Sequence, residues 1–335
     1  MPLALLPRSH LPPTPDSPCL PTILPLVSEP IEQLTSLDGL VDYKTASYSS
    51  YPAISNSAPA SLLTGLNVLT ATRDALDYLH HIYTSNSSVQ ESFTSSVSLI
   101  AETIRKNGRL MVCGVGKSGK IAHKFVATCN SMRIRASILD PTDALHGDLG
   151  GISEVSKYNI LLQVFKLMNI QNDTIALLTA SSNTPELLML LPHLTAHPLI
   201  LLTARPHTLS DPNPLIHQRL NLLTAAQTLS KRPSSVSSTI LLLTPLAHGR
   251  SEKQVTGVSA PTVSTTITLA VCDALAVAVA QALHGGLVDE EEEIEELEKL
   301  EKRSKSMDNV EMVFRGCHPG GNLGIKSIIS GSNHR

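Results

Sequence analysis

The segment Leu110–Cys129, LMVCGVGKSGKIAHKFVATC, passes from an apolar strand through a glycine-rich turn into a helix. Leu110–Cys113 is continuously apolar and β-prone, and Ile121 and Phe125 mark one apolar face of the stretch that follows. Backbone N–H groups and the helix dipole then point at whatever lies above the turn, and glycines let it approach the backbone. The segment therefore predicts a strand–turn–helix unit that binds an anion.

Four more apolar, β-prone runs follow along the chain, and helical stretches separate the first four of the five strands. The runs do not alternate between apolar and polar residues, which indicates strands that are buried on both faces of a sheet. The sequence therefore predicts an α/β fold with a mainly parallel five-stranded sheet, whose later strands are Ala136–Leu139, Thr174–Leu178, Leu199–Leu202 and Thr239–Leu243.

Helices are expected on either side of this pattern. Leucines at helical spacing follow Ala60, and a second helix is predicted over Val89–Lys106. The last core helix is predicted over Val263–Leu283. Its stretch Ile267–Leu283 is the longest apolar one in the chain, but it is slightly short for a membrane span and carries Asp273 in its middle. We therefore expect a buried helix and no membrane as a partner.

The composition excludes several classes of partner. The 335 residues carry a net charge of −3, which gives no sign of binding to nucleic acid or to an anionic membrane. Trp is absent and aromatic residues make up 3%, so stacking platforms for bases or sugars are not expected. The five cysteines are widely spaced without a C-x-x-C pair. We therefore expect a reducing compartment, the cytoplasm, and no structural zinc site.

Three segments depart from the α/β pattern. Residues 1–60 are rich in Pro and Ser, so we expect them to be disordered or loosely packed, with one domain over 61–335. Residues 287–308 are expected to form an insertion whose acidic run is a solvated, partly helical segment or an interaction tail. The third segment, 155–171, reads VSKYNILLQVFKLMNIQ and is unusually apolar for a loop. It is either a translated intron, since its end codons can match splice sites, or a genuine amphipathic insertion.

The glycine-rich turn itself admits three interpretations. Gly114–Gly119 matches the dinucleotide fingerprint G-x-G-x-x-G, and Asp140 follows it by about 20 residues, as a ribose-binding acid should. Against this, Lys117 puts a cation inside the turn and Asp140 runs directly into Pro141. A Walker A loop is excluded, because Met111 stands where its first glycine is required. A sugar monophosphate site is the third interpretation, and it needs hydroxyl groups from other loops.

Two hydroxyl clusters supply such groups. Thr179–Glu186, TASSNTPE, precedes an apolar helical run, and its four hydroxyls exceed what an ordinary helix cap needs, which favours phosphate binding. Thr262–Thr266, TVSTT, begins the last core helix, where capping and phosphate binding stay equal alternatives. The candidate substrate-binding and phosphate-binding residues are Gly116, Ser118, Thr179, Ser181, Ser182, Thr184, Ser264 and Thr265.

Four motifs together resemble a known family: GVGKSGKIAHKFVAT from Gly114, ALHGDLG from Ala144, APTVSTTITLAVCDALAVAVA from Ala260, and HPGGNLG from His318. In this order and approximate spacing they closely resemble the arabinose 5-phosphate isomerases of the sugar isomerase (SIS) domain family, and excision of 155–171 removes the remaining gap. The resemblance implies a doubly wound sheet with helices on both faces. It also implies a homo-oligomer, commonly a tetramer, with sites at subunit borders. Family members interconvert aldose and ketose phosphates, here D-arabinose 5-phosphate and D-ribulose 5-phosphate, through an enediol.

The resemblance also assigns residues. Lys117 matches the lysine of the family's glycine-rich loop, and Glu186 matches the second glutamate of its serine-rich loop. His318 matches the histidine of H-P-G-G, and Glu252 matches a glutamate upstream of A-P-T when a one-residue gap is allowed. His146 matches the histidine of H-G-D, a position linked with metal sensitivity. The resemblance thus implies four catalytic residues, no required cofactor and an inhibitory or modulatory divalent metal at His146.

The chemistry of these groups fits an isomerisation of a sugar phosphate. Moving a proton between C1 and C2 needs a base near pH 7, which a partly shielded carboxylate such as Glu252 can supply. A solvated loop carboxylate beside Arg250 and Lys253 is the alternative for this residue. His318 suits the acid–base step that opens a cyclic sugar, and Lys117 can stabilise the enediolate.

The serine-rich loop departs from the family pattern S-G-E-S-S-E, because Ser182 and Asn183 replace the glycine and the first glutamate. A non-catalytic regulator that binds a sugar phosphate is therefore the alternative function. Many bacterial relatives carry CBS domains after this domain, and we expect none here, because the chain ends shortly after H-P-G-G. His318 lies beyond the last core helix, so we expect a neighbouring subunit to hold it.

Overall fold

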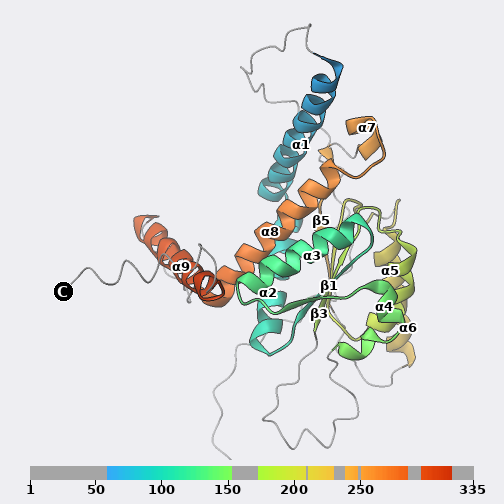
Figure 1. Ribbon diagram of the computed structural model, residues 1–335. Coiled ribbons are helices and arrows are strands. Elements are labelled where there is room, and N and C mark those ends of the chain that lie inside the picture. The colour runs from blue at the N-terminus through green and yellow to red at the C-terminus, as the bar shows by residue number, and fades with distance from the viewer. Residues whose placement is uncertain are drawn as a thin grey trace, which may run out of the picture.

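The computed structural model describes residues 59–152, 173–208, 210–229, 238–247, 250–285 and 296–318. Its sheet has five parallel strands in the order β2-β1-β3-β4-β5, which confirms the predicted parallel α/β fold (Figure 1). These strands are β1 (Leu110–Gly114), β2 (Ala136–Ile138), β3 (Thr174–Leu178), β4 (Leu199–Thr203) and β5 (Thr239–Leu243).

The strand order reverses at β1, because β2 lies on one side of it and β3 on the other. The register places Val112 of β1 between Ile138 of β2 and Ala176 of β3. In open α/β sheets, ligands bind at such a reversal, in the crevice outside the carboxyl ends of the strands. The fold therefore points to the loops after β1 and β3 as the place for a ligand.

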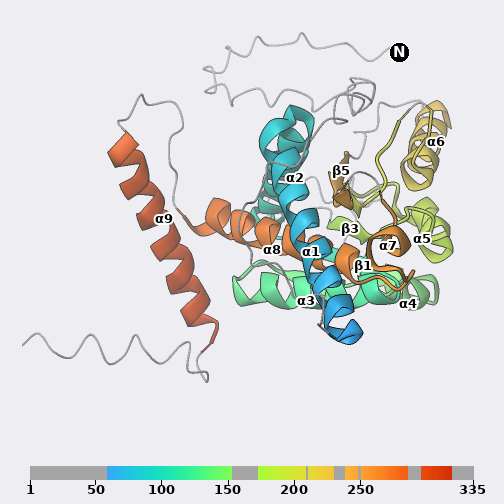
Figure 2. The same ribbon diagram turned by 90° about the horizontal axis from the view of Figure 1, so that it is seen from above.

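Helices cover both faces of the sheet, which confirms the doubly wound arrangement (Figures 1 and 2). Side chains of β1 alternate between the two layers: Leu110 and Val112 join one core, while Met111 and Cys113 join the other. The first layer contains α1 (Ala60–Ser85), α2 (Ser87–Arg105), α3 (Lys117–Ser131) and α8 (Val263–His284); the second contains α5 (Pro185–Leu190), the 3-10 helix η4 (Leu191–Leu194) and α6 (Pro214–Leu229).

Helix α8 is the central helix of the first layer. By length and composition it could cross a membrane, but more than half of its apolar stretch is buried inside the protein, where it packs against α1, α2 and α3. Asp273, in the middle of the helix, pairs with Lys124 of α3 at the protein surface. The helix is therefore part of the core, as its sequence predicts.

Helix α9 (Glu296–Gly316) lies outside the two layers and packs against α8 alone among the major contacts (Figure 2). It includes residues 296–308 of the predicted acidic insertion and continues to Gly316, so the described part of this insertion is one long helix that leads to His318. Residues 1–58 and the segment 155–171 lie outside the described residues.

Two shorter helices complete the loops at the carboxyl end of the sheet. Helix α4 (Pro141–Leu145), followed by the 3-10 helix η2 (Asp148–Gly151), comes after β2, and α7 (Glu252–Thr256) precedes α8. Neither α4 nor α7 is predicted from the sequence, and both are too short to show an apolar period.

Candidate functional site

The glycine-rich turn between β1 and α3 can be built only from small residues. A Cβ atom on Gly114 would lie 2.8 Å from the backbone carbon of Ser118, and one on Gly119 would lie 2.9 Å from the carbonyl oxygen of Gly114. Gly116 has a φ of 60°, a backbone conformation that glycine adopts without strain. The three glycines therefore bring the end of β1 against the first turn of α3 and leave no side chain above it.

A cavity of about 280 Å³, here called the hydroxyl cavity, opens beside this turn. It draws Ser118 from α3, Thr179 from the loop after β3, and Ser264 and Thr265 from the first turn of α8. The glycine-rich turn and both hydroxyl clusters singled out in the sequence thus meet in one place, at the carboxyl ends of β1 and β3. Such convergent hydroxyl groups can donate to the oxygen atoms of a phosphate or a sugar.

Lys117 lies on the wall of the hydroxyl cavity at the start of α3. Its ammonium group donates a hydrogen bond to the carbonyl oxygen of Pro261 at 3.0 Å, which ties α3 to the residue just before α8. A carbonyl does not neutralise the charge, so Lys117 gives the wall of this cavity a cation that can interact with an anionic ligand. Lys117, a predicted catalytic residue, therefore lies in the same cavity as the hydroxyl groups.

Glu252 holds the amino-terminal end of α8. Its Oε1 accepts hydrogen bonds from the backbone N–H of Thr262 and of Val263, each at 2.8 Å, and from the Thr262 hydroxyl at 2.5 Å. Oε2 accepts one longer bond, of 3.2 Å, from the N–H of Ser264. The carboxylate therefore satisfies helix N–H groups that would otherwise have no partner.

These contacts set the protonation of Glu252. Burial alone would raise the pKa of this carboxyl, but the hydrogen bonds from Ser264, Thr262 and Val263 outweigh it and lower the pKa below its ordinary value of 4.5. The sequence suggested that Glu252 is a base with a pKa near neutral pH. The structure instead lowers the pKa of this carboxyl. Glu252 is ionised at neutral pH, and its less occupied Oε2 is the oxygen atom that can accept a proton.

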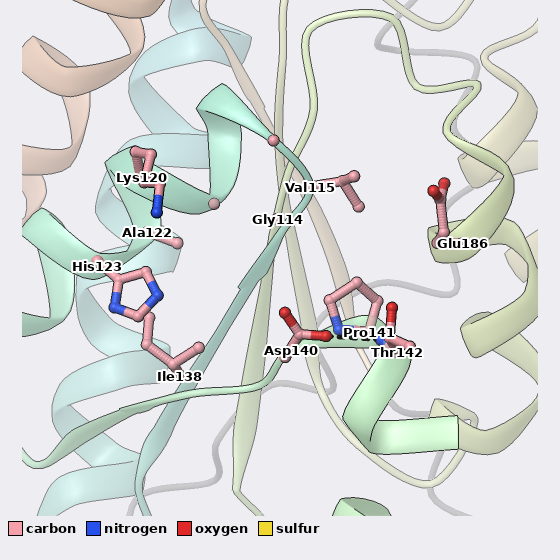
Figure 3. A pocket seen from close by; sticks show the side chains of 12 residues that line it. Gly114, Val115, Lys120, Ala122, His123, Ile138, Asp140, Pro141, Thr142 and Glu186 are labelled. Atoms are coloured by element: carbon pink, nitrogen blue, oxygen red, sulfur yellow. Dashed lines mark hydrogen bonds between the residues drawn. The ribbon is translucent and has the colours of Figure 1, made fainter. Parts of the chain in front are cut away.

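A second cavity of about 240 Å³, here called the charged cavity, lies on the other side of the glycine-rich turn (Figure 3). Figure 3 shows Lys120 and His123 of α3 on one side of Asp140 and Glu186 of α5 on the other. Glu186 lines this cavity and not the hydroxyl cavity. The structure therefore does not bring the predicted catalytic residues Glu186 and Lys117 into the same cavity.

Asp140 stands at the end of β2, where a dinucleotide fold places its ribose-binding acid. Here its Oδ1 caps α4, accepting from the N–H groups of Thr142 at 2.8 Å and Asp143 at 3.3 Å. Pro141 at the first position of α4 explains the sequence Asp-Pro, because proline suits the first turn of a helix. The cap of α4 therefore explains an aspartate at this position without a bound dinucleotide.

The serine-rich loop contributes less to the hydroxyl cavity than its composition suggests. Ser182 is fully buried, has a φ of 54°, and bonds Thr203 at 2.7 Å and Asn213 at 2.8 Å, so it braces the loop from within. Ser181 is exposed and accepts a hydrogen bond from Asn183 N–H, and Thr184 bonds Thr179 at 2.9 Å. Of the hydroxyl-bearing residues of this loop only Thr179 lines the hydroxyl cavity, next to Ala180. Gly116, in the glycine-rich turn, lines the charged cavity.

His146, the candidate metal position, ends α4 and is exposed. Among the residues that the structure describes, no group of three or more His, Cys, Asp and Glu side chains could hold a metal ion. A metal at His146 is therefore supported by the family resemblance alone.

His318 follows α9 and lies far from Lys117 in the same chain. Gly316 lies beside the guanidinium of Arg133, just beyond the end of α3, whereas Lys117 begins α3. Since α3 has 15 residues, its two ends are about 22 Å apart. The imidazole stacks on Phe314 with ring centroids 4.2 Å apart, and Nδ1 donates to the Phe314 carbonyl oxygen at 2.8 Å, which leaves Nε2 to accept a proton.

Sequence reasoning missed several residues of these cavities. Thr268 lines the hydroxyl cavity one turn below Ser264, and its hydroxyl donates to the Ser264 carbonyl at 2.8 Å. Val115 lines both cavities, and Lys120 and His123 line the charged cavity. The helical spacing of Thr268 from Ser264 could have indicated that both residues lie on the same face of the helix. Nothing in the sequence distinguishes Val115 from a buried turn residue.

Several sequence relatives of the chain are arabinose 5-phosphate isomerases. No family model matches the chain. The arabinose 5-phosphate isomerase KdsD of Francisella tularensis is 29% identical over 159 residues, which are 47% of this chain and 43% of that protein. KdsD of Yersinia pestis is 26% identical over 267 residues, 79% of this chain and 58% of its own length. The arabinose 5-phosphate isomerase GutQ of Salmonella typhi is 30% identical over 120 residues, 35% of this chain and 31% of its own length.

Solved structures show a weaker likeness. A protein of E. coli CFT073 in complex with a sugar phosphate is 24% identical and has a TM-score of 0.44, over 67% of this chain and 93% of its own. A phosphoheptose isomerase from Francisella tularensis is 16% identical with a TM-score of 0.40, over 67% of this chain and all of its own. Because these TM-scores are below 0.5, only the sequence relatives support the resemblance.

This chain spans less than two thirds of the length of each of those sequence relatives. It is nevertheless similar in sequence to three arabinose 5-phosphate isomerases, which confirms the resemblance that its motifs indicate.

Proposed function

We propose that this protein is an aldose–ketose isomerase that interconverts D-arabinose 5-phosphate and D-ribulose 5-phosphate through an enediol. The observation that carries the proposal is the hydroxyl cavity, where Lys117 and the side chains of Ser118, Thr179, Ser264 and Thr265 converge at the switch point of the sheet. A small anionic ligand with several hydroxyl groups matches this lining. The names of the sequence relatives support the same class of reaction.

The phosphate belongs beside the first turn of α3. No side chain caps that helix, since Gly116 has none, so its first N–H groups can donate to an anion together with the hydroxyls of Ser118 and Thr179. The amino-terminal end of α8 is different, because Glu252 already occupies its N–H groups. The hydroxyl cavity thus has one free helix end for the phosphate. Glu252 does not line this cavity, but it binds the end of α8 that supplies Ser264 and Thr265 to the cavity wall.

In the proposed reaction, Glu252 takes a proton from the carbon next to the carbonyl, using Oε2, and returns it to the former carbonyl carbon. The hydroxyl proton of the deprotonated carbon passes to the former carbonyl oxygen, which completes the interconversion. Its lowered pKa makes Glu252 a weaker base than one matched to pH 7, but the hydrogen bonds from Thr262, Val263 and Ser264 keep the carboxylate ionised. The ammonium of Lys117 stabilises the negative charge that develops on the enediolate oxygen. These proposed steps require no cofactor.

His318 enters the proposal from a second subunit. In one chain it lies at the opposite end of α3 from Lys117, yet ring opening of a cyclic sugar needs an acid–base group near the substrate. A homo-oligomer, a tetramer by resemblance, would place His318 of one subunit at the hydroxyl cavity of another. We also propose a cytoplasmic protein, because Cys113, Cys129, Cys272 and Cys317 are all free thiols.

A regulator that binds a sugar phosphate without turnover is the second candidate. The observation in its favour is the separation of the predicted catalytic groups, since Lys117, Glu186 and His318 do not meet within one chain. Both functions require sugar-phosphate binding at the hydroxyl cavity. They differ in whether ribulose 5-phosphate is converted.

The test compares two lysines of α3. The protein is incubated with ribulose 5-phosphate and arabinose 5-phosphate is assayed, while thermal shifts report binding separately. We expect Lys117→Ala to lower kcat/KM at least about 100-fold, because its cation stabilises developing charge. Lys124→Ala should retain activity, since Lys124 lines neither cavity and forms an exposed ion pair with Asp273. Binding without turnover in the wild type would favour the regulator, and absence of both would contradict either function.

A further inference from the structure

Val115 is the one residue common to the linings of the hydroxyl and charged cavities. It stands between Gly114 and Gly116 at the end of β1, and its side chain is partly exposed. Its methyl groups also pack against the second core layer, which holds the side chain in place. Figure 3 shows Val115 pointing across the charged cavity towards Glu186. The two cavities are therefore neighbours that share Val115 as a lining residue.

Of the ionisable side chains that line the charged cavity, only Asp140 makes a contact that the fold uses, among the described residues. Among the described residues, the side chains of Lys120, His123 and Glu186 have no hydrogen-bond or ion-pair partner. Asp140 uses Oδ1 for the cap of α4, and its Oδ2 has no partner there either. Two groups that accept hydrogen bonds thus face two that donate them, a set that matches sugar hydroxyls, since each hydroxyl both donates and accepts.

We propose that the charged cavity is a subsite for the extra hydroxyl-bearing carbons of longer sugar phosphates, and that Val115 closes it and so limits the length of the substrate. This inference rests on the proposed function. A sugar phosphate held by its phosphate at Ser118 and Thr179 can extend towards Asp140 and Glu186 only past Val115. With valine in this position a pentose phosphate fills the hydroxyl cavity, and a longer sugar meets the valine methyl groups.

The size of the expected effect follows from the removal of two methyl groups. One methylene in a binding pocket changes discrimination between substrates by roughly 10-fold to 200-fold. Val115→Ala should therefore raise the ratio of kcat/KM for hexose and heptose 6- or 7-phosphates over pentose 5-phosphates at least about tenfold. Val115→Ile should lower the same ratio, because it adds a methylene group to the wall.

A double variant tests whether the charged cavity provides the new contacts. Asp140→Asn keeps an oxygen atom to cap α4, and asparagine is as good a cap as aspartate. It replaces the unused Oδ2 acceptor with an amide donor, so Val115→Ala with Asp140→Asn should lose most of the gain in the ratio. Asp143→Asn is the matched control, because Asp143 lies on the same helix without lining either cavity.

The experiment measures kcat/KM and, by thermal shift, relative affinity for pentose, hexose and heptose phosphates in each variant. Val126→Ala serves as the second control, since Val126 of α3 packs against the first core layer and lines neither cavity. A shift in the ratio for Val115→Ala alone, reversed by Asp140→Asn, supports the inference. An unchanged ratio in a folded Val115→Ala protein that still acts on pentose phosphates overturns it and leaves the proposed function standing. A wild type that neither binds nor converts any sugar phosphate overturns both.

Discussion

At the scale of single residues, Glu252 shows how one carboxylate can serve the fold and the proposed reaction together. Its type and distance from A-P-T led to a predicted base. In the structure Glu252 begins α7, and its carboxylate binds the first turn of α8, which supplies Ser264 and Thr265 to the hydroxyl cavity. Because the carboxylate fixes that turn, Glu252 positions the hydroxyl groups even before it takes part in any proton transfer.

This position predicts a pH-dependent loss of stability in Glu252→Gln. The amide would present an N–H group to helix N–H donors, so we expect a loss of about 1 kcal/mol at pH 7. The folded pKa is lowered, so the contribution of the carboxylate is present above the ordinary value of 4.5 and is lost as the pH falls through the folded value.

Melting temperatures from pH 7 to pH 3 measure this effect. The gap between the wild type and Glu252→Gln should narrow below about pH 4.5. Glu91→Gln, on the exposed side of α2, is the control for a general change in charge. A gap that stays constant across this range would show that the cap does not depend on ionisation.

At the scale of elements, the glycine-rich turn decides where the site can form. Gly114 and Gly119 allow β1 and α3 to meet more closely than any side chain permits, and Gly116 adopts the positive φ between them. The free end of α3 consequently faces the carboxyl end of the sheet. The spacing of the glycines is therefore a steric requirement of this turn, shared by dinucleotide folds and by this protein.

Two glycine variants test that requirement in opposite directions. Gly119→Ala places a Cβ atom 2.9 Å from the Gly114 carbonyl oxygen, so we expect a loss of about 1–3 kcal/mol and weaker sugar-phosphate binding. Gly65→Ala lies within α1 with nothing within 4 Å, so it should gain about 0.5–1 kcal/mol. Urea denaturation gives both values, and equal behaviour of the two variants would contradict the steric argument.

At the scale of the whole molecule, the proposed site is incomplete in one chain. Helix α9 carries His318 away from the sheet and along the far end of α8 (Figure 2). The first turns of α1 expose Leu62 and Leu69, which are 51% and 67% accessible. An exposed apolar helix face together with a histidine remote from its site is what a subunit of an oligomer would show.

Mixing two inactive variants tests this assembly. Lys117→Ala and His318→Ala are each expected to lack activity as pure proteins. After subunit exchange in equal amounts, roughly a quarter of the shared sites will combine an intact Lys117 with an intact His318 of another chain. Partial recovery of turnover is the expected result. A protein that is monomeric in solution, or proven exchange without recovery, would exclude shared sites.

The sequence predicts the sheet well and the connections less well. All five strands lie where their apolar runs indicate, and the second and last core helices differ from prediction by no more than two residues. Helix α6, between β4 and β5, is absent from the prediction, and its buried Leu215 and Ile216 form only a short apolar signal. Strands buried on both faces must be apolar throughout, whereas a helix that covers an outer face needs only part of one side.

The sequence alone predicts the parallel α/β fold, the glycine-rich strand–turn–helix unit and the hydroxyl clusters, because these depend on residue type and on spacing within one segment. Which of these groups meet depends on the tertiary fold. The fold brings Ser118, Thr179 and Ser264 to one cavity, buries Ser182 against Thr203 and ties Glu252 to α8. It places Glu186 and Lys117 in different cavities. The physical reason is that contacts between distant segments follow from strand order and loop packing, which local residue patterns do not encode.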